Sequence, residues 1–504
     1  MIVFTGYLIA IVLILFPLYY YYAKCYALEK FYHQFPSPPK TPFFGNALDL
    51  KTTKDLFQSF HRYVKAYGTM VHLKIGPFDH MLLCSNPKFL EFLLTSNTLL
   101  KKSPNLRYLV PWIGTGVATA YGPKWKLHRK LVTPAFHYSV LSQFVNTFES
   151  SGNILVEKIS KLCDGQKVDN FDLYPHITRC TFDIICETAM GTKSNVQTNE
   201  TSVYFESIKE MCRIFMSRTM AVFQRYDFIF RFSKDFHLQK KALDIIHNYS
   251  NEVIATKRKE LDENVKQKES VDDLGRKEKM VFLDMILNKA IDGHIFSQEA
   301  IRGEVDTFMF AGHDTTATAI SFILLCIANH NEVQDKIIEE QERLFGCEKN
   351  PKVTFAHLQE MQFLENVIKE GLRLYTPVPL YGRQIDKNVE FEGMLIPKGV
   401  NVVIFNHGVH MNPEFYPNPE KFDPNRFESM EDKHPFAFIP FSAGPRVCIG
   451  KKFAILEIKS ILSKIVRNFE LFPASPSYEL DLAAETVLKS LNGIRIGIKR
   501  RETF

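Results

Sequence analysis

The chain has 504 residues, of which 45% are hydrophobic and 43 are phenylalanine, and its formal net charge is +6. A chain of this length and apolar content can bury a large core, and we interpret it as one large domain. The mild net charge and the absence of a Lys/Arg tail argue against a nucleic-acid-binding protein.

The N-terminal segment from Met1 to Ala23 contains no charged residue and is mostly apolar. About 20 such residues span a bilayer as a helix, so residues 1–23 are predicted to form a transmembrane anchor. A cleaved signal peptide is the alternative, but the segment lacks a basic start and a small-residue cleavage site. Lys24, Lys30 and Lys40 follow it with no positive side chain before it, which predicts that the rest of the chain lies on the cytosolic face.

Residues 24–43 are predicted to connect this anchor to a globular part, residues 44–504. They include Phe35-Pro-Ser-Pro-Pro-Lys-Thr-Pro42, whose prolines favour a stiff, extended segment close to the membrane. The nine cysteines show no paired spacing, which agrees with a reducing compartment. Glycosylation sequons at Asn199 and Asn248 would then carry no glycan.

Strand-type runs stand near the two ends of the chain, at residues 70–73, 81–84, 389–393 and 400–405. From about residue 88 to residue 375 the pattern is mostly helical. The charged segment from Thr256 to Lys279 interrupts it and is predicted to be a solvated loop. The predicted fold class is therefore mainly α, with a smaller β-rich portion split between the two ends.

One apolar helical stretch has an unusually polar centre, Ala311-Gly-His-Asp-Thr-Thr316. On a helix, Thr315 shares a face with Ala311, so its hydroxyl can reach the Ala311 carbonyl and open the helix locally. Gly312 would keep a Cβ out of the resulting groove, and Asp314 could supply protons from the far side. The alternative is an ordinary core helix with back-bonded threonines and a salt-bridged aspartate.

The motif Glu-x-x-Arg occurs four times, at Glu210/Arg213, Glu299/Arg302, Glu340/Arg343 and Glu370/Arg373. Each can be a helix-surface pair, which stabilises a helix by only a few tenths of a kcal/mol. Glu370/Arg373 is preferred because it lies in an apolar helical pattern that Pro377 ends.

A turn near the C-terminus, Phe441-Ser-Ala-Gly-Pro-Arg446-Val-Cys448-Ile-Gly450, holds a single cysteine directly before a helical pattern. Its glycines permit close backbone approach, and Phe441 can cover the sulfur. A helix N-terminus and the Arg446 guanidinium are expected to lower the pKa of the Cys448 thiol, and the thiolate is the form that binds metal. Most intracellular cysteines are only small buried residues. The surroundings of this one indicate a thiolate ligand for haem iron.

This string resembles the haem-binding signature of the cytochrome P450 superfamily, with every fixed position occupied. The resemblance covers nearly the whole chain. It implies the cytochrome P450 fold with an N-terminal transmembrane helix, and Cys448 as the axial ligand of haem b. Ala311, Gly312, Asp314 and Thr315 are similar to the oxygen-activation motif of the family. In that role Thr315 hydrogen-bonds dioxygen and Asp314 lies on the proton relay.

The resemblance extends to residues that hold the core and the haem edge. Glu370, Arg373 and Arg426 resemble a structural Glu-Arg-Arg triad, which locks the core and does no chemistry. Trp125-Lys-Leu-His-Arg129 is similar to a helix motif whose Trp and Arg contact a haem propionate. The alternative for this pair is a packed amphipathic turn. Further candidate propionate ligands are Arg446 and Arg383.

Reduction of the iron requires an electron donor. Basic residues flank two motifs that the family fold places on the cysteine side: Lys124, Lys126, Arg129, Lys130, Lys451 and Lys452. Together they could dock an acidic NADPH-dependent cytochrome P450 reductase, and cytochrome b5 is a candidate additional partner. Each lysine taken singly is equally well explained as part of a solvated surface.

Several long strings resemble family four, the branch known for fatty-acid ω-hydroxylation: residues 186–191, 304–310, 312–316 and 434–446. Many members of that branch place a glutamate where this chain has Ala311, and its carboxylate esterifies a haem methyl. Because alanine cannot form an ester, we expect haem held by Cys448 and non-covalent contacts only.

The hypothesis for function is a single-pass endoplasmic reticulum monooxygenase, whose catalytic domain uses NADPH-derived electrons and O₂ to hydroxylate fatty acids near the ω end. Oxidation of xenobiotics, sterols or other lipids is the alternative within the same chemistry. A haem-thiolate isomerase acting on peroxides needs neither Asp314, Thr315 nor a reductase surface, and a haem carrier needs no oxygen-activation motif. Segments rich in Phe, Met and Leu suit an apolar substrate. The candidate pocket segments are residues 106–119, 204–232, Phe308 and residues 488–491.

Overall fold

The computed structural model describes residues 26–199, 203–268, 281–288, 296–346, 348 and 350–502. The predicted anchor at residues 1–23 lies outside the described residues and stays a prediction. Part of the predicted connector is described, and it packs on the body of the protein. Phe31 and Tyr32 are buried, and the His72 amide donates to the Pro36 carbonyl at 2.9 Å.

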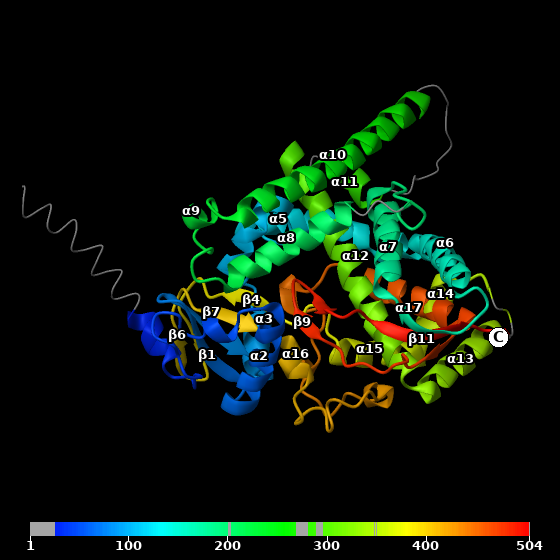
Figure 1. The fold of residues 1–504 in the computed structure, drawn as a ribbon. Helices are drawn as coiled ribbons and strands as arrows, with labels where there is room; N and C mark the ends of the chain where they lie inside the picture. Colours follow the sequence, from blue (N-terminus) through cyan, green and yellow to red (C-terminus); the bar gives the residue numbers. More distant parts are fainter. Residues whose placement is uncertain are drawn as a thin grey trace, which may run out of the picture.

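Helices make up most of the molecule (Figure 1). They are α2 (Thr53–Tyr67), α3 (Pro87–Thr95), α4 (Val110–Ile113), α5 (Gly122–Val132), α6 (Tyr138–Cys163), α7 (Tyr174–Ile185), α8 (Val203–Met220), α9 (Asp227–Phe230), α10 (Lys234–Lys268), α11 (Phe282–Asn288), α12 (Gln298–Ala328), α13 (Asn331–Phe345), α14 (Phe355–Glu360), α15 (Gln362–Leu374), α16 (Asn406–His410) and α17 (Lys451–Asn468).

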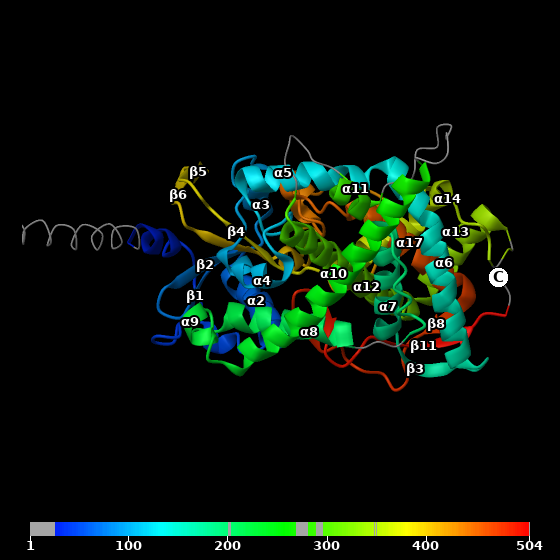
Figure 2. The ribbon, with the colours of Figure 1, turned by 90° about the horizontal axis from the view of Figure 1, so that it is seen from above.

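The strands form small sheets at two sides of the helical body (Figure 2). They are β1 (Met70–Ile75), β2 (Asp79–Cys84), β3 (Val168–Asp172), β4 (Tyr381–Gln384), β5 (Val389–Phe391), β6 (Met394–Ile396), β7 (Asn401–Ile404), β8 (Phe469–Phe472), β9 (Leu482–Ala484), β10 (Leu488–Ser490) and β11 (Arg495–Arg500).

The largest sheet joins the two ends of the chain, in the order β1-β2-β7-β4. β1 and β2 form an antiparallel hairpin around Gly76, whose φ of 67° suits a residue without a Cβ. β7 pairs parallel to β2, and β4 pairs antiparallel to β7. The expected fold class, mainly α with a smaller β-rich portion, is confirmed, except that β3 lies in the helical middle of the chain and not near an end.

Helix α12 passes through the middle of the molecule and packs against α7, α10, α15 and α17 (Figure 1). Within the described ranges it alone is long and apolar enough to cross a membrane, yet 78% of its most apolar window is buried in protein. Its hydrophobic character is therefore that of a core helix.

The predicted loop from Thr256 to Lys279 is wrong in its first half, because α10 continues to Lys268. Acidic and basic side chains alternate there at helical spacing, with Lys257 at 3.3 Å from Glu260 and Lys259 at 3.9 Å from Glu263. Such pairs support a solvated helix as readily as a solvated loop. Residues 269–279 lie outside the described part of the chain.

Of the four Glu-x-x-Arg pairs, Glu370/Arg373 in α15 is fully buried. The carboxylate accepts two bonds from Arg373, at 2.7 Å and 2.8 Å, and a third from the Asp423 amide at 2.9 Å. Arg426, in the short 3-10 helix η5 (Pro424–Phe427), approaches the same carboxylate at 3.4 Å. Arg373 also donates to the carbonyls of residues 410, 419 and 421. The expected triad residues therefore meet, and they tie α15 to the chain that leads to the cysteine turn.

Replacing Glu370 with alanine is predicted to destabilise the protein strongly. It leaves the buried Arg373 charge unpaired, a change that typically costs about 3–5 kcal/mol. The matched control is Glu210→Ala, which breaks the exposed pair with Arg213 and should cost less than about 1 kcal/mol. Thermal unfolding followed by circular dichroism compares the two variants. Equal shifts of the midpoint would contradict a core role for Glu370.

Candidate active site

A cavity of about 290 Å³ lies between α12 and the cysteine turn before α17. Cys448, Phe441 and Arg446 line it from the turn, and Ala311, Gly312 and Thr315 line it from α12. Most of its remaining wall is apolar, including Phe136, Ile185, Phe308, Leu372, Pro377, Val378 and Phe453. The two strongest sequence motifs, more than 120 residues apart in the chain, therefore face one space.

The cysteine turn is held by its own backbone. The Cys448 amide donates to the Phe441 carbonyl at 2.9 Å, around a short 3-10 helix, η7 (Gly444–Arg446). Gly444 has a φ of 65°, and a Cβ there would lie 1.9 Å from the Leu94 carbonyl oxygen, so no side chain fits. At Gly450 an added Cβ would meet only the Cys448 sulfur, at 3.9 Å. Close approach of the backbone therefore explains why residue 444 is a glycine, but it does not explain the glycine at residue 450.

Cys448 differs from the other cysteines that the structure describes. Its accessible surface borders the cavity inside the protein, whereas Cys84, Cys163, Cys180, Cys186, Cys212 and Cys326 are buried in packed core. Burial raises the pKa of the Cys448 thiol above its usual value, although the Gly450 amide and the charges of Arg129, Lys102 and Lys451 favour the thiolate. The expectation that its surroundings lower this pKa is wrong, because desolvation outweighs them. A bound metal would reverse the balance, since a coordinating thiol is deprotonated.

The centre of α12 has the expected local opening. Thr315 Oγ1 donates to the Ala311 carbonyl at 2.8 Å, and both residues face the cavity. The reason for a glycine at position 312 differs from the expected one. A Cβ there would lie 2.5 Å from the side chain of Ile185, so the glycine permits close packing of α7 on α12. Asp314 does not border the cavity; it lines a separate hollow with Tyr174 and Lys489.

Four cationic side chains gather around the cysteine end of the cavity: Lys102, Arg129, Arg383 and Arg446. Lys102 and Arg446 border the cavity. Arg383 is only 2% exposed and lies on β4, which bridges to Lys102. Arg129 of α5 donates to the Val447 carbonyl at 3.0 Å, and Arg446 stacks on the Trp125 ring at 4.1 Å.

These cations stand close enough to repel one another. Burial and then the charges of Arg383 and Arg129 lower the pKa of Arg446 to about 9. Burial and the charges of Arg383 and Arg446 also hold the pKa of Lys102 well below its usual value. Among the residues that the structure describes, none of the four forms an ion pair with a carboxylate. Buried charge without a partner is costly, so this cluster fits an anionic group.

The donor set suits haem. Cys448 would ligate the iron, and Lys102, Arg129, Arg383 and Arg446 would neutralise the two propionates, with Trp125 packed beneath Arg446. Of these cations, sequence reasoning missed Lys102. Its sequence context, Leu100-Lys-Lys-Ser103, does not distinguish it from Lys101. Only the position of Lys102 beside Arg383 in the folded protein distinguishes it from Lys101.

A buried pair between α12 and α5 also escaped sequence reasoning. Glu304 of α12 lies 2.5 Å from His128 Nδ1 of α5 and accepts from the Val117 amide at 2.8 Å. A Cβ on Gly116 would clash with the Glu304 carboxylate. This contact ties α12 to the helix that carries Trp125 and Arg129.

The outer face of α5 is hollowed and basic. A surface depression of about 590 Å³ is lined by Trp125, Lys126, Arg129, Lys130, Thr133, Pro134 and His137. Lys124, Lys451 and Lys452 are exposed. The Arg129–Val447 bond brings this face next to the cysteine turn.

Of the segments expected to form the substrate pocket, Phe308 lines the Cys448 cavity. Residues 106–119, 204–232 and 488–491 are not among its lining residues. Phe205, Ile208, Lys489, Ser490 and Leu491 instead line the hollow that holds Asp314. Two of these segments adjoin the cavity, because Arg446 donates to the Val117 carbonyl at 3.4 Å and the Leu488 amide donates to the carbonyl of the lining residue Pro377 at 2.7 Å, and all three stay predictions.

Comparison with known proteins agrees with this geometry. The family model described as Cytochrome P450 matches residues 35–492. The chain is 36% identical to "Cytochrome P450 4c3" of Drosophila melanogaster over 489 residues, which cover 94% of this chain and 91% of the relative. It is 38% identical to "Cytochrome P450 4V2" of Homo sapiens over 472 residues, which cover 91% of this chain and 88% of the relative.

Replacing Lys102 with methionine is predicted to weaken haem retention. Loss of one charge-assisted hydrogen bond to a propionate costs about 1.5–3 kcal/mol, which corresponds to about ten- to a hundredfold faster loss. Transfer of haem to excess apomyoglobin measures the rate. Lys101→Met is the matched control, because Lys101 lies beside Tyr121, away from the cavity lining. Equal rates for the two variants would show that Lys102 holds no propionate.

Proposed function

Because the chain belongs to the cytochrome P450 family and is a monooxygenase, we propose that it hydroxylates fatty acids near their ω end while anchored to a membrane. The observation that carries this proposal is the cavity in which Cys448 and Thr315 face each other among apolar side chains. The long strings that resemble family four support the choice of substrate class.

The reaction takes O₂, two electrons and two protons, converts one C–H bond to C–OH and releases one water. Bound haem would supply the iron chemistry that activates oxygen. Cys448 would hold the iron as a thiolate. Thr315 presents its hydroxyl to the cavity and would hydrogen-bond dioxygen. Asp314 adjoins it in α12 and would pass the protons.

The cavity wall favours an apolar substrate. Phe136, Ile185, Phe308, Leu372 and Val378 surround the α12 side, and the cationic residues in the lining, Lys102 and Arg446, belong to the propionate cluster. An alkyl chain that lies against these apolar side chains beside the haem would bury apolar surface without stranding a charge. Xenobiotics and sterols are the alternative substrate classes that experiments must exclude.

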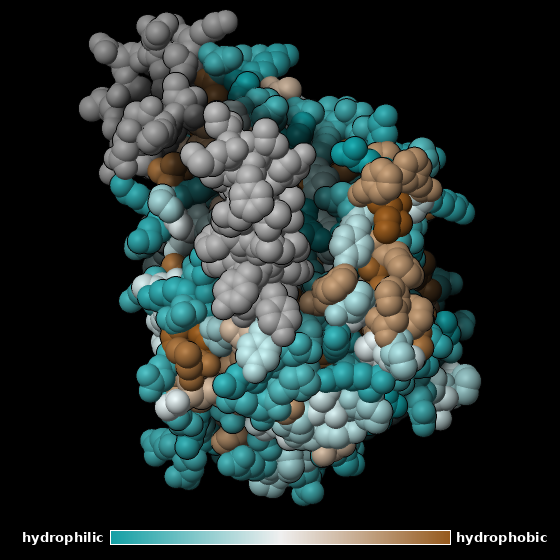
Figure 3. Space-filling model, turned by 90° about the vertical axis from the view of Figure 1, so that its left-hand side faces the viewer, coloured by the Kyte–Doolittle hydropathy of each residue, from teal (hydrophilic) through white to brown (hydrophobic). Residues whose placement is uncertain are grey.

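An exposed hydrophobic patch supports membrane attachment. Around α9 the exposed side chains are Phe223, Tyr226, Phe228, Ile229 and Phe232, and next to them lie Phe43, Leu48 and Phe78 of the N-terminal part. The rings of Phe43 and Phe223 are tilted against each other with centroids 6.0 Å apart, which joins the two groups. Figure 3 shows hydrophobic side chains gathered on this face. An exposed apolar patch of this kind marks a surface that contacts a membrane or another protein.

We further propose the endoplasmic reticulum membrane as the location, with one N-terminal span and the catalytic domain on the cytosolic side. NADPH-dependent cytochrome P450 reductase would supply the electrons through the basic depression on α5. That surface is complementary in charge to an acidic partner and borders the cysteine turn. Cytochrome b5 is a second candidate for the same surface.

Spectroscopy and turnover test this function. The reduced protein with carbon monoxide should give the Soret band typical of thiolate-ligated haem, and Cys448→Ala should abolish it. With reductase and NADPH, lauric and longer fatty acids should yield ω-region alcohols. A thiolate-type band without fatty-acid products, together with turnover of a sterol or xenobiotic, would sink the substrate proposal and leave the monooxygenase chemistry intact.

The haem is predicted to be released from the denatured wild-type protein by acidified organic solvent, because Ala311 cannot form an ester. Ala311 lines the cavity, so Ala311→Glu should retain part of the haem covalently after turnover. Ala311→Gln is the matched control and should retain none, since an amide cannot esterify the haem methyl. Haem-stained denaturing gels measure the linkage, and a stained wild-type band would refute the prediction.

The α9 patch is predicted to enter lipid in the full-length protein. Phe228→Trp places a reporter at a side chain that is 74% exposed, and Leu162→Trp places one at a 52% exposed position of α6. In vesicles with brominated acyl chains, the fluorescence at residue 228 should be quenched and that at residue 162 should not. Equal quenching would count against a specific membrane face.

A further inference from the structure

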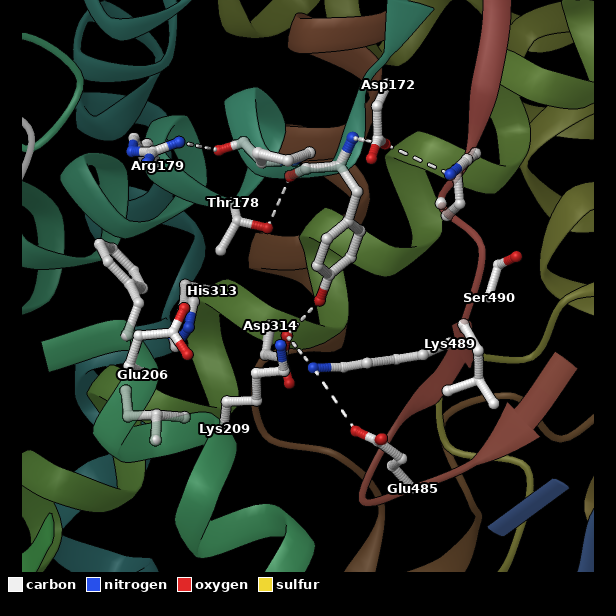
Figure 4. Close-up of a pocket in the computed structure, with 17 residues that line it drawn as sticks. Asp172, Thr178, Arg179, Glu206, Lys209, His313, Asp314, Glu485, Lys489 and Ser490 are labelled. Carbon is white, nitrogen blue, oxygen red and sulfur yellow. Dashed lines mark hydrogen bonds and ion pairs between the residues drawn. The ribbon is translucent and has the colours of Figure 1, made fainter. Parts of the chain in front are cut away.

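Helix α12 carries buried acidic side chains that are held by different elements of the fold. Asp314 accepts a hydrogen bond from the Tyr174 hydroxyl of α7 and lies 3.6 Å from Lys489 Nζ of β10 (Figure 4). Glu304, ten residues earlier in the helix, contacts α5 instead, where it lies 2.5 Å from His128 Nδ1. The proposed reaction gives a role to Asp314 and none to Glu304.

One carboxylate oxygen of Glu304 makes both polar contacts of this side chain. Oε1 lies 2.5 Å from His128 Nδ1, and it accepts from the Val117 amide at 2.8 Å. The side chains of Glu304 and His128 are almost fully buried, with exposed fractions of 1% and 4%. Oε2 is also buried and has no hydrogen-bond partner among the described residues. The carboxylate therefore joins α12 to α5 and to residues 114–121, the loop that precedes α5.

The backbone of this loop approaches α12 closely at two glycines. A Cβ on Gly116 would lie 2.5 Å from Glu304 Oε1, although the φ angle of Gly116 lies outside the left-handed region and suits any residue. On the helix side, a Cβ on Gly303 would lie 3.0 Å from the Ile113 carbonyl oxygen. The missing side chains let the loop come close enough for its Val117 amide to reach the Glu304 carboxylate.

Carbonyl groups of the same loop hold Arg446. Its guanidinium donates to the Ala120 carbonyl at 2.5 Å and to the Val117 carbonyl at 3.4 Å. Val117 therefore gives its amide to Glu304 and its carbonyl to Arg446. Because Arg446 borders the Cys448 cavity and is a candidate propionate ligand, one chain of contacts runs from α12 through the loop to the cation cluster.

We propose that Glu304, His128 and Gly116 are positioning residues that hold residues 114–121 against α12 and thereby aim the Arg446 guanidinium at a haem propionate. A loop released from α12 would carry its carbonyl groups away from Arg446, and the guanidinium would then lose its fixed direction. The inference rests on haem binding, which membership of the cytochrome P450 family implies. It does not depend on the class of substrate.

The alternative is a structural pair that only fastens α5 to α12. Such a pair would stabilise the whole fold, because removing one partner leaves a buried polar group unpaired. Its loss would then weaken haem retention whether or not residue 446 is an arginine. Positioning acts through Arg446, so its effect must disappear when Arg446 is absent. A double-mutant cycle distinguishes the two roles.

Transfer of haem from the full-length holoprotein to excess apomyoglobin measures the effect. Glu304→Leu and Gly116→Ala should each speed haem loss about tenfold, the size expected when a charge-assisted hydrogen bond to a propionate is lost. Glu304→Gln should retain haem nearly as well as the wild type, because its amide oxygen still accepts from the Val117 amide. In an Arg446→Met background, which itself loses haem faster, Glu304→Leu and Gly116→Ala should change the rate by no more than about twofold.

Hydrogen exchange in the holoprotein tests the loop contact separately from haem loss. Amides of residues 114–121 should exchange faster in Glu304→Leu and Gly116→Ala than in the wild type, because the loop opens more often. Glu149→Leu is the matched control, since it breaks the largely buried pair with Lys464, at 2.7 Å, between α6 and α17. This control should destabilise the fold and leave both haem loss and loop exchange unchanged.

Additive effects of Glu304→Leu and Arg446→Met on haem loss, or equal haem loss in Glu149→Leu, would overturn the inference. Wild-type retention in Gly116→Ala would also overturn it. If Glu304→Leu does not fold, Gly116→Ala decides the question, because it leaves both buried polar groups in place. Haem loss and hydrogen exchange need no substrate, so both readouts stay decisive if the fatty-acid proposal fails.

Discussion

Buried positive charge beside Cys448 is the constraint on which the active-site architecture depends. Lys102, Arg129, Arg383 and Arg446 come from four separate segments, and they meet without a carboxylate partner among the described residues. Such a cluster is unfavourable unless an anion joins it. The two propionates of a bound haem would meet that requirement and relieve the repulsion among the cations. Folding without haem would leave these charges to repel one another.

Helix α12 resolves a conflict between two needs of the same reaction. An apolar substrate requires a dry cavity, whereas oxygen activation consumes protons from water. The helix presents Thr315 to one side and Asp314 to the other, because successive helical residues point about 100° apart. Its polar interior is tolerated because each threonine hydroxyl at positions 315, 316 and 318 bonds a carbonyl four residues earlier.

Much of the fold followed from local pattern. The β1–β2 hairpin, the strands after residue 388 and the long helical middle were expected, because periodicity and turn residues act over short distances. The prediction of a loop at residues 256–268 was wrong, because dispersed charge suits both a loop and a solvated helix. Local pattern also does not specify which surface an apolar residue faces. Phe308 lies in the Cys448 cavity, whereas Phe205, Ile208 and Leu491 line the hollow that holds Asp314.

By itself, the sequence determined the turn that carries Cys448 and the Ala311–Thr315 opening, because each depends on contacts within ten residues or fewer. It also determined that no ester can form at residue 311. Only the tertiary structure decided which Glu-x-x-Arg pair is buried, which of Lys101 and Lys102 faces the cavity, and which groups hold Asp314. Tyr174 and Lys489 lie more than 300 residues apart, and only the packing of α7, α12 and β10 brings them to one carboxylate.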